Sequence, residues 1–516
     1  MNALIPLLLC AALPLQAAID PAWLDAKSAQ QALKDGSLSS EQLVQHYLNQ
    51  IEQHNQQGHQ LAAIIDINPD ALAMARARDQ ERAAGAVLSP LHGLPVVLKA
   101  NIATADSMPT TAGALTLQGF ITEQDAELVT QLRAAGAVIL AKTNLSEWAN
   151  FRGTGSASGW SALGGQTRNP HVLSHTPCGS SSGSGVAVAA DFALLAVGTE
   201  TDGSIICPAA INGVVGIKPT RGSVSGHGII PIASAQDIAG PMARKVYDAA
   251  LLLDAMLTAE ARQQFAMPLS EASQQAVTTR QVVVVRAYDE YDDAIGTMLD
   301  QLVEQLLAAG IAVQQVDSWQ VPAELYQSEL EVLVYEYKRD LEQWLRDFKV
   351  PAPVNSLQGI VDFNHAKGEE ALAFFGQEYL QQAAAVNLTE QAPYYQKALA
   401  QSRELAEALL DEHLLNASAI ILPSYGPAWP IDHAQGDQFN FGTSTPAAVA
   451  GYPSINLPAG FSGPFPLGVS IVGSPWSEPE LLALAQLLEQ QLAAYRQPAF
   501  LAAPPANSSE NQPTSK

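Results

Sequence analysis

Residues 164–220 contain the groups in this chain that are best suited to chemistry. Residues 177–185 are mostly glycine and serine, and the apolar run 186–197 follows them at once. A glycine- and serine-rich segment is often a flexible linker, but a linker seldom leads directly into a buried helix. The pattern instead predicts a loop at a helix N-terminus, where backbone N–H groups and hydroxyls can bind an anionic centre.

Two familiar interpretations of this loop fail on the neighbouring residues. A phosphate-binding P-loop requires a lysine after its last glycine, and no lysine lies between Gly164 and Gly216. Residues 179–183 also satisfy G-x-S-x-G, with Ser181 at the centre, as in the nucleophile elbow of α/β-hydrolases. That elbow follows a strand, whereas residues 169–178 contain two prolines and no strand pattern. The loop therefore favours neither a nucleotide site nor an α/β-hydrolase.

The region as a whole resembles the amidase signature family. The Gly/Ser-rich block of that family is matched by residues 178–185, its nucleophile block by residues 198–208, and its closing segment by residues 218–220. Further similar segments lie on both sides of the signature, at 92–102, 143–148, 447–454 and 466–473. The resemblance covers about residues 25–495 and is weakest across the middle of the chain.

Three details look most like the peptide amidase branch of the family, namely residues 108–113, 158–161 and 199–204. The fold that the resemblance implies is α/β, with a mixed twisted β-sheet core surrounded by α-helices and a helical elaboration. The activity that it implies is the hydrolysis of carboxamides to carboxylate and ammonia. This branch acts on C-terminal peptide amides or amino-acid amides, so these are the expected substrates.

Transferred position by position, the resemblance implies a Ser–Ser–Lys triad. Ser204 aligns with the nucleophile, Ser180 with a bridging serine that follows a cis peptide bond from Gly179, and Lys99 with the base. A serine hydroxyl is a poor nucleophile unless a base takes its proton. A lysine can be that base only when it is neutral, so its pKa must be lowered by burial. The apolar residues 96–98 before Lys99 favour this, although a lysine at a strand end commonly extends to water instead.

The resemblance also assigns the groups around the triad. The backbone N–H groups of Thr201, Asp202, Gly203 and Ser204 are expected to form the oxyanion hole. Ser181 could orient the lysine, or it could simply satisfy a turn. The family more often has glycine at position 202 and at position 178, so Asp202 could place a carboxylate near the substrate entrance.

The implied mechanism is acyl transfer to a serine. Ser204 attacks the amide carbonyl while its proton passes through Ser180 toward Lys99, the amine leaves, and water hydrolyses the acyl-enzyme. No cofactor and no metal are expected, and the sequence contains no HExxH, CxxC or clustered-histidine pattern. Two histidines, His92 and His175, lie in or beside the matched segments and are expected to be structural or surface residues.

Short apolar, β-branched runs predict the buried strands that must position these groups. They occupy residues 96–102, 137–140, 281–285, 419–422 and 468–472. Helical spacing lies between them: at 39–51, where Ser39 is a start signal; at 125–133; and at 481–492, after a predicted capping box at 477–480. Strands that alternate with helices indicate an α/β fold around a mixed sheet.

Two further segments differ from this alternation. Residues 293–415 favour helix and have no strand-like run after Val313, so we expect a helical layer over the sheet domain. We expect residues 18–500 to form a single domain and residues 501–516 to be a disordered tail. After the N-terminus, no run reaches the length of a transmembrane helix.

The N-terminus resembles a secretory signal. Residues 3–15 are apolar and small residues follow, which predicts a signal peptide over residues 1–17 and a secreted or periplasmic protein. The missing Lys or Arg before the apolar run keeps a cytoplasmic location open. Cleavage would leave two cysteines, Cys178 and Cys207, which is too few for a disulfide framework. Whether they pair stays open, and two buried thiols are favoured.

Composition restricts the partners. The chain has 516 residues, of which 26 are Lys or Arg and 51 are Asp or Glu, so the formal net charge is −25. Charged residues make up 15%, against about 25% in an average globular protein, so the charge reflects a shortage of basic side chains. Nucleic acid and anionic membranes are therefore disfavoured as partners. A hydrophobic content of 47% excludes global disorder.

Two alternatives to a stand-alone amidase remain. One is the glutamine-hydrolysing subunit of a tRNA amidotransferase, against which the export signal and the low basic content count. The other is a catalytically silent binding protein on the same scaffold, against which the presence of all three triad residues counts. The substrate is a small-molecule or peptide amide in the leading interpretation, and the sequence does not fix the oligomeric state.

Overall fold

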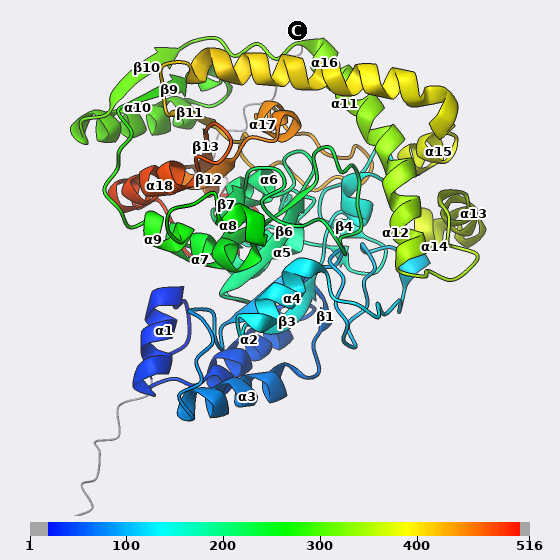
Figure 1. The fold of residues 1–516 in the computed structure, drawn as a ribbon, viewed down its shortest axis with the longest axis horizontal. Coiled ribbons are helices and arrows are strands. Elements are labelled where there is room, and N and C mark those ends of the chain that lie inside the picture. The colour runs from blue at the N-terminus through cyan, green and yellow to red at the C-terminus, as the bar shows by residue number, and fades with distance from the viewer. Residues whose placement is uncertain (1–18, 506–516) are drawn as a thin grey trace, which may run out of the picture.

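A single eleven-stranded sheet runs through the residues that this computed structural model describes, 19–505, and helices surround it (Figure 1). The strand order is β1-β3-β2-β6-β8-β7-β12-β13-β11-β9-β10. The strands are β1 (Ile64–Ile67), β2 (Pro95–Lys99), β3 (Val138–Thr143), β6 (Leu195–Glu200), β7 (Val215–Lys218), β8 (Ile238–Ala243), β9 (Gln281–Val285), β10 (Ala312–Val316), β11 (Ala419–Pro423), β12 (Ser454–Ser462) and β13 (Phe465–Val472). A separate small sheet pairs β4 (Trp160–Ser161) with β5 (Gly165–Gln166).

The sheet is mixed, as the sequence predicts. Strands β3, β2 and β6 are parallel neighbours, and β11, β9 and β10 are parallel neighbours at the other end. The strands between these two groups pair antiparallel. Every residue of β2, β3, β6 and β8 is buried, which explains why they are continuous apolar runs rather than alternating ones.

The predicted strands are all present, with adjusted ends. The predicted 96–102 run ends earlier, because β2 stops at Lys99, and the predicted 468–472 run begins earlier, because β13 starts at Phe465. Strand β9 has the predicted bounds. Since β2 ends at Lys99, this residue lies at the carboxyl end of a strand that is buried in the middle of the sheet.

The helices cover both faces and one side of the sheet. They are α1 (Ala26–Asp35), α2 (Ser40–His54), α3 (Ala71–Ala83), α4 (Glu127–Ala134), α5 (Ser182–Ala189), α6 (Ile206–Ile211), α7 (Val246–Met256), α8 (Ala259–Arg262), α9 (Leu269–Ala272), α10 (Asp293–Ala308), α11 (Ala323–Glu336), α12 (Glu342–Asp347), α13 (Leu357–Lys367), α14 (Glu369–Leu372), α15 (Glu378–Ala384), α16 (Leu388–Leu414), α17 (Thr445–Ala450) and α18 (Glu478–Leu492). Short 3₁₀ turns at Leu115–Leu117, Glu147–Asn150 and Asp289–Tyr291 and a π turn at Tyr337–Leu341 complete them.

The two predicted helix starts have different outcomes. Helix α2 begins as expected, with a capping box between Ser39 and Gln42. The capping box predicted at Ser477 is wrong: α18 does begin at Glu478, but Ser477 makes no capping hydrogen bond. The reason is tertiary, because Glu480, the expected partner, accepts a hydrogen bond from Thr279 Oγ1 at 3.0 Å instead.

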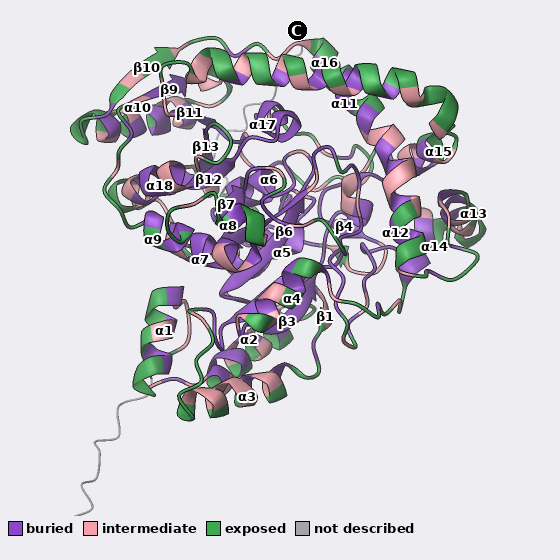
Figure 2. Ribbon diagram, in the orientation of Figure 1, coloured by how far each residue is buried: buried purple, intermediate pink, exposed green. Residues whose placement is uncertain are grey.

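The apolar run 186–197 is not one helix. Helix α5 ends at Ala189, and β6 begins at Leu195, so the last part of the run belongs to the central sheet. All eight residues of α5 are buried (Figure 2), as expected for a helix that follows the glycine- and serine-rich loop. A Cβ at Gly183 would overlap Ala63 O, so glycine is what allows the helix to approach its neighbours so closely.

The helical layer predicted over residues 293–415 is present as α10 to α16, with β10 as its one strand within the described residues. Helix α16, 27 residues long, lies along the outside of the molecule and packs against α11 and α17 (Figure 1). Helix α10 instead packs against β12 and α18. Helices α10 and α16 therefore lie over the end of the sheet that contains the C-terminal strands, whereas α12, α13 and α15 share a hydrophobic cluster with side chains from residues 100–151.

The predictions for the two ends of the chain fall mostly on residues outside the described range. The signal peptide predicted over residues 1–17 lies outside the described residues, and so do residues 506–516 of the predicted tail. Leu501, the first residue of that tail, is ordered in a β-bridge with Val172. Within residues 19–505, no helix has both the length and the apolar character that crossing a membrane requires.

Candidate active site

Lys99 is the last residue of β2, and its side chain is fully buried. Its Nζ lies 2.7 Å from Ser180 Oγ and donates to Thr199 O at 3.0 Å and to Thr199 Oγ1 at 2.9 Å. Burial lowers the pKa of Lys99 to about 7, although Asp237 and Glu200 act in the opposite direction. A lysine with this pKa is substantially neutral near pH 7, which a general base requires.

Ser180 and Ser204 continue this line of polar groups. Ser180 is fully buried and follows a cis peptide bond from Gly179. Its Oγ lies 2.9 Å from the Oγ of Ser204, which stands in the turn between β6 and α6. Because a hydroxyl can donate and accept at once, the line Lys99–Ser180–Ser204 is continuous for a proton. The structure therefore brings together the three residues that the sequence predicts to act together.

Ser181, which the sequence suggests could either orient the lysine or satisfy a turn, contacts Thr199. Its Oγ donates to Thr199 O at 3.0 Å and accepts from Thr199 N at 3.1 Å. It makes no hydrogen bond to Lys99 within the described residues. Since Lys99 also donates to Thr199 O, Ser181 acts on the lysine through the position of Thr199.

The turn that carries Ser204 presents free backbone donors. Within residues 19–505, the N–H groups of Asp202, Gly203 and Ser204 have no hydrogen-bond acceptor. Thr201, just before them, is anchored through its side chain, whose Oγ1 donates to Asp237 Oδ1 at 2.5 Å. The N–H group of Thr201 likewise has no acceptor within the described residues, so all four residues predicted for the oxyanion hole have backbone N–H groups without a partner.

Glu200 holds the shape of this turn. Its Oε2 accepts hydrogen bonds from Ile205 N at 2.7 Å and Ile206 N at 2.9 Å, at the start of α6. Burial raises the pKa of Glu200, and the charge of Lys218 opposes that shift. The carboxylate thus takes the N–H groups that follow Ser204, while the N–H groups before it have no acceptor within the described residues.

Gly203 and Asp202 complete the turn, Gly203 through its backbone and Asp202 through its side chain. Gly203 has a φ of +73°, and a Cβ there would overlap Tyr425 Oη and lie 2.9 Å from Ser444 Oγ. Asp202 accepts hydrogen bonds from Ser444 Oγ and Thr445 Oγ1, both at 2.6 Å. Burial raises the pKa of Asp202, whereas these two hydrogen bonds lower it.

A cavity of about 600 Å³ opens beside Ser204. Its lining combines the catalytic turn, aromatic side chains and two carboxylates, Asp202 and Asp437, and it contains no lysine or arginine. Helix α11 of the helical layer contributes Tyr326 and Leu333. The aromatic residues of the lining are Phe151, Tyr288, Tyr326, Tyr425, Trp429, Phe439 and Phe441.

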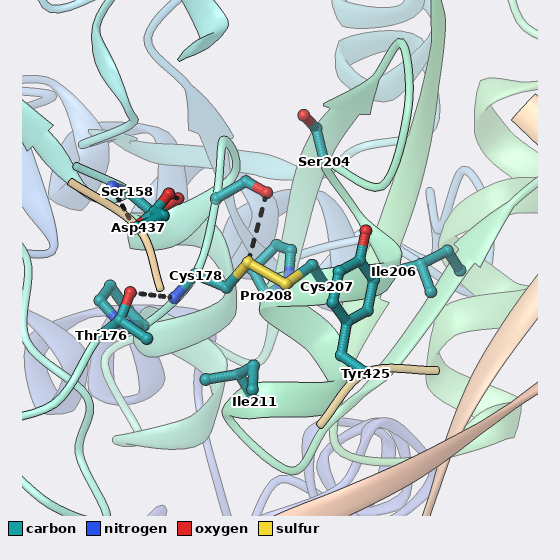
Figure 3. Close-up of a disulfide and its surroundings, with 12 residues drawn as sticks. Ser158, Thr176, Cys178, Ser204, Ile206, Cys207, Pro208, Ile211, Tyr425 and Asp437 are labelled. Carbon is teal, nitrogen blue, oxygen red and sulfur yellow. Dashed lines mark hydrogen bonds between the residues drawn. A yellow bond between two sulfur atoms is a disulfide. The ribbon is translucent and has the colours of Figure 1, made fainter. Parts of the chain in front are cut away.

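Cys178 and Cys207 form a disulfide with a Cα–Cα distance of 5.9 Å. The favoured prediction of two buried thiols is therefore wrong. The sequence could not decide this, because the two residues are separated by 29 positions and only the fold brings α6 against the segment before α5. Figure 3 shows the disulfide beneath Ser204, with Tyr425 and Asp437 on either side.

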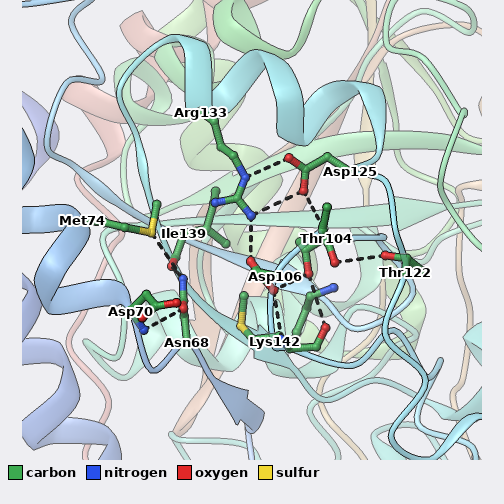
Figure 4. A network of polar contacts seen from close by, with 12 residues as sticks. Asn68, Asp70, Met74, Thr104, Asp106, Thr122, Asp125, Arg133, Ile139 and Lys142 are labelled. Atoms are coloured by element: carbon green, nitrogen blue, oxygen red, sulfur yellow. Dashed lines mark hydrogen bonds and ion pairs between the residues drawn. The ribbon is translucent and has the colours of Figure 1, made fainter.

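A second polar network supports the segment that follows Lys99 (Figure 4). Arg133 donates to Asp125 Oδ2 at 2.9 Å and to Asp106 Oδ2 at 2.7 Å. The fully buried Lys142 donates to Ile102 O, and burial lowers the pKa of Lys142 to about 7. These contacts fix the backbone of residues 102–106 just beyond the lysine of the site.

The two histidines of the matched region are buried and lie outside the cavity lining. His92 Nε2 is 3.0 Å from Arg78 O, and His175 Nδ1 is 3.0 Å from Ser174 Oγ. Burial lowers the pKa of His175 to about 4. The structural interpretation therefore fits both residues better than the surface one. Within the described residues, no three His, Cys, Asp or Glu side chains are grouped as metal ligands.

Several residues of the site escaped prediction. Thr199 and Glu200 belong to the recognised block, and an acidic residue directly after an apolar strand is a signal that could have singled out Glu200. Asn101 lies in the matched segment 92–102, two residues after Lys99, and could have been singled out in the same way, whereas Asp237 had no such signal. Asn101 Nδ2 donates to Thr199 Oγ1 at 3.0 Å and so steadies the main partner of Lys99.

Comparison with known proteins identifies the family of this chain. The amidase family model matches residues 42–482. A probable amidase of Arabidopsis thaliana is 36% identical over 496 residues, which is 91% of this chain and 90% of that protein. A glutamyl-tRNA(Gln) amidotransferase subunit from Thermus thermophilus is 32% identical, over 89% of this chain and 95% of its own.

Among solved structures, the native peptide amidase from Stenotrophomonas maltophilia is highly similar. It superposes with a TM-score of 0.86 at 44% identity, covering 93% of this chain and 99% of its own. This chain therefore belongs to the amidase signature family and is a hydrolase of amide bonds, as the resemblance in its sequence predicts.

Proposed function

We propose that this chain hydrolyses C-terminal peptide amides or amino-acid amides to carboxylate and ammonia through an acyl-enzyme on Ser204. The observation that carries the proposal is the continuous line from Lys99 Nζ through Ser180 Oγ to Ser204 Oγ, with steps of 2.7 and 2.9 Å. Both steps are short enough for direct proton transfer.

The proton relay begins at the lysine. In its neutral form Lys99 has two N–H bonds and one lone pair. Thr199 O and Thr199 Oγ1 accept the two N–H bonds, so the lone pair is directed at Ser180. Ser204 passes its proton to Ser180 as it attacks the amide carbon, and Ser180 passes its own proton to Lys99. The protonated relay then returns a proton to the leaving nitrogen, and ammonia departs.

The free N–H groups of Asp202, Gly203 and Ser204 stabilise the intermediate. The carbonyl oxygen becomes an oxyanion when Ser204 attacks, and the backbone donors of this turn have no other acceptor within the described residues. Each such donor contributes about 3–4 kcal/mol to the transition state in other hydrolases. Water then attacks the acyl-enzyme by the same relay and releases the carboxylate.

The substrate class is supported by the cavity and by similarity. A volume of about 600 Å³ lies in the range of pockets that hold small ligands, and its aromatic walls suit the side chains of a short peptide. The similarity to a peptide amidase covers nearly the whole of both chains. The similarity to the amidotransferase protein is weaker, and the charge of −25 argues against a tRNA-linked partner.

Release of ammonia from a panel of amides tests the proposal. The panel holds a C-terminally amidated dipeptide, an amino-acid amide, free glutamine and a fatty acid amide. We expect the first two to have the highest kcat/KM. We expect Ser204→Ala to lose at least about a thousandfold in kcat, whereas Ser107→Ala, at a serine outside the cavity lining, stays at the level of the unchanged chain. Activity confined to glutamine would favour the amidotransferase role, and no activity on any amide would favour a silent scaffold.

We further propose that the chain is exported. The support is the apolar segment 3–15 and the Cys178–Cys207 disulfide, since disulfides persist mainly in oxidising compartments. N-terminal sequencing of the protein from a fractionated culture should find a mature start near residue 18 in the exported fraction. A cytoplasmic protein that keeps residues 1–17 would contradict this.

A further inference from the structure

The disulfide joins the two segments that hold the hydroxyls of the relay. Cys178 stands two residues before Ser180, and Cys207 stands three residues after Ser204. Both cysteines also line the cavity beside Ser204 (Figure 3). A covalent bond therefore spans the gap across which a proton must pass between the two serines.

Hydrogen bonds also join these segments. Ser181 Oγ donates to Thr199 O at 3.0 Å and accepts from Thr199 N at 3.1 Å. Ser181 N donates to Ser204 O at 3.1 Å. Further from the serines, Asn212 Nδ2 donates to Pro177 O at 2.8 Å and to Pro208 O at 2.7 Å. Cys178 and Cys207 both line the cavity, and their disulfide is the covalent link between the two segments there.

The backbone conformation at Cys178 is unfavourable for a cysteine. Cys178 has a φ of +52°, in the left-handed region that glycine adopts freely and that costs an L-residue energy. A glycine would suit this backbone better than any side chain. A cysteine at such a position indicates that the bond it forms has a use that outweighs the conformational cost.

We propose that the Cys178–Cys207 disulfide is a positioning device for amide hydrolysis, which holds Ser180 Oγ within proton-transfer distance of Ser204 Oγ. The proposal rests on the function proposed above. Neither cysteine touches the reacting atoms, so both are positioning residues. Displacing a reacting group by about 1 Å can reduce a rate about a hundredfold, so loss of this link is expected to act on kcat.

Reduction by dithiothreitol is the direct way to remove the link. One thiolate attacks a disulfide sulfur and forms a mixed disulfide. The second thiol of the reagent then closes a ring, which leaves oxidised dithiothreitol and two cysteine thiols. The balance is two electrons and two protons transferred from the reagent to the protein. Thiol titration after unfolding counts the cysteines that were freed.

The experiment compares kcat, the rate of fluorophosphonate labelling of Ser204, and the folded fraction, at a temperature well below unfolding. We expect reduction to lower kcat and the labelling rate together by about tenfold or more, with the folded fraction unchanged, and reoxidation to restore both. A disulfide that only stabilises the fold would lower the unfolding temperature without changing either rate. Equal rates in the oxidised and fully reduced proteins would overturn the proposal.

Two double variants keep the test decisive if the reagent does not reach the bond. Cys178→Ala/Cys207→Ala removes the link, and Cys178→Gly/Cys207→Ala removes it while giving the backbone its preferred residue. We expect both variants to have the kcat and the labelling rate of the reduced protein. We expect neither rate to change when dithiothreitol is added. Full activity in the glycine variant would overturn the proposal, because the backbone alone would then position Ser180. Absence of amide hydrolysis in the oxidised, unchanged chain would instead refute the proposed function itself.

Discussion

At the scale of single residues, the site depends on a lysine that burial keeps near neutrality. Lys99 has no carboxylate within ion-pair distance among the described residues, and hydroxyl and carbonyl oxygens surround its Nζ. Such surroundings favour the uncharged amine, which can accept a proton. Because burial lowers the pKa of Lys99 to about 7, the rate of the enzyme should change with pH in the range where this lysine gains a proton.

The first prediction concerns this pH dependence. Because burial sets the pKa of Lys99 at about 7, the base is protonated below that pH, and kcat/KM should fall about tenfold per unit as pH decreases further. The charge of Asp237 raises the pKa of Lys99, but burial raises the pKa of Asp237 itself to about 7. Asp237→Asn should therefore move this acid limb to lower pH only in so far as Asp237 is ionised there, and should not move it upward. Steady-state ammonia release between about pH 5 and 9 measures both. A kcat/KM that does not fall below about pH 7, or a limb that moves upward in Asp237→Asn, would contradict the assignment of Lys99.

The second prediction concerns Gly203. A Cβ at this position would overlap Tyr425 Oη, so Gly203→Ala must displace the turn that carries the free N–H groups. We expect kcat to fall about a hundredfold or more, as when one oxyanion donor is lost. Gly36→Ala is the matched control, because Gly36 has a similar φ of +74° but open space around its Cβ position. The control should lose stability and keep its kcat. If both variants keep full kcat, the turn is not the oxyanion site.

Sequence reasoning reached the three residues of the relay, but it missed other residues of the site, both inside the recognised blocks, such as Thr199 and Glu200, and outside them, such as Asp237. Lys99, Ser180 and Ser204 were found because their blocks carry recognisable patterns. Asp237 escaped because an isolated aspartate in a loop has no pattern, and its effect on Lys99 depends on a sheet that no local rule specifies. The pairing of Cys178 and Cys207 escaped for the same reason.

At the scale of elements, the site lies where a central strand, a buried helix and a tight turn meet. Strand β2 ends at Lys99, the loop before α5 supplies Ser180, and the turn between β6 and α6 supplies Ser204. Strand existence was predictable from apolar β-branched runs. Strand order was not, because pairs such as β7 with β12 join segments more than 200 residues apart.

The third prediction tests the role of α11 as a wall of the cavity. Leu333 lines the cavity from this helix and touches no residue of the proton relay. Leu333→Ala should therefore raise KM for apolar peptide amides about fivefold, the equivalent of about 1 kcal/mol of lost apolar contact, and leave kcat unchanged. Leu330→Ala, at an exposed leucine of the same helix that is absent from the cavity lining, is the control. A loss in kcat with unchanged KM would assign α11 a different role.

At the scale of the whole molecule, one sheet gathers groups that are far apart in sequence. It contains β2, which ends at Lys99, and β13, which ends at Val472. The net charge of −25 belongs to the same scale, since an electrostatic field sums over the molecule. The sheet determines where the serine lies, and the net charge affects which charged substrates can approach it.

The fourth prediction follows from that field. The cavity lining has two carboxylates, Asp202 and Asp437, and no cationic side chain. Burial raises the pKa of both carboxyls, and hydrogen bonds from Ser158 to Asp437 and from Ser444 and Thr445 to Asp202 oppose that shift. At a pH above these pKa values both groups are negatively charged. An amide with an acidic side chain should therefore have a lower kcat/KM than its neutral isostere. The test compares glutamate α-amide, the acidic substrate, with glutamine α-amide, its neutral isostere. Added salt should narrow the difference by screening. Equal values at low salt would contradict this electrostatic account.

The central claim is that Ser204 is the nucleophile and that Lys99 activates it through Ser180. Mass spectrometry of the protein after reaction with a fluorophosphonate, followed by peptide mapping, tests this claim most directly. We predict one adduct per chain, on Ser204, with no adduct in Ser204→Ala and a labelling rate at least about a hundredfold lower in Lys99→Met. An adduct on Ser180 or Ser181, or labelling of Ser204 that is as fast without the lysine, would contradict it.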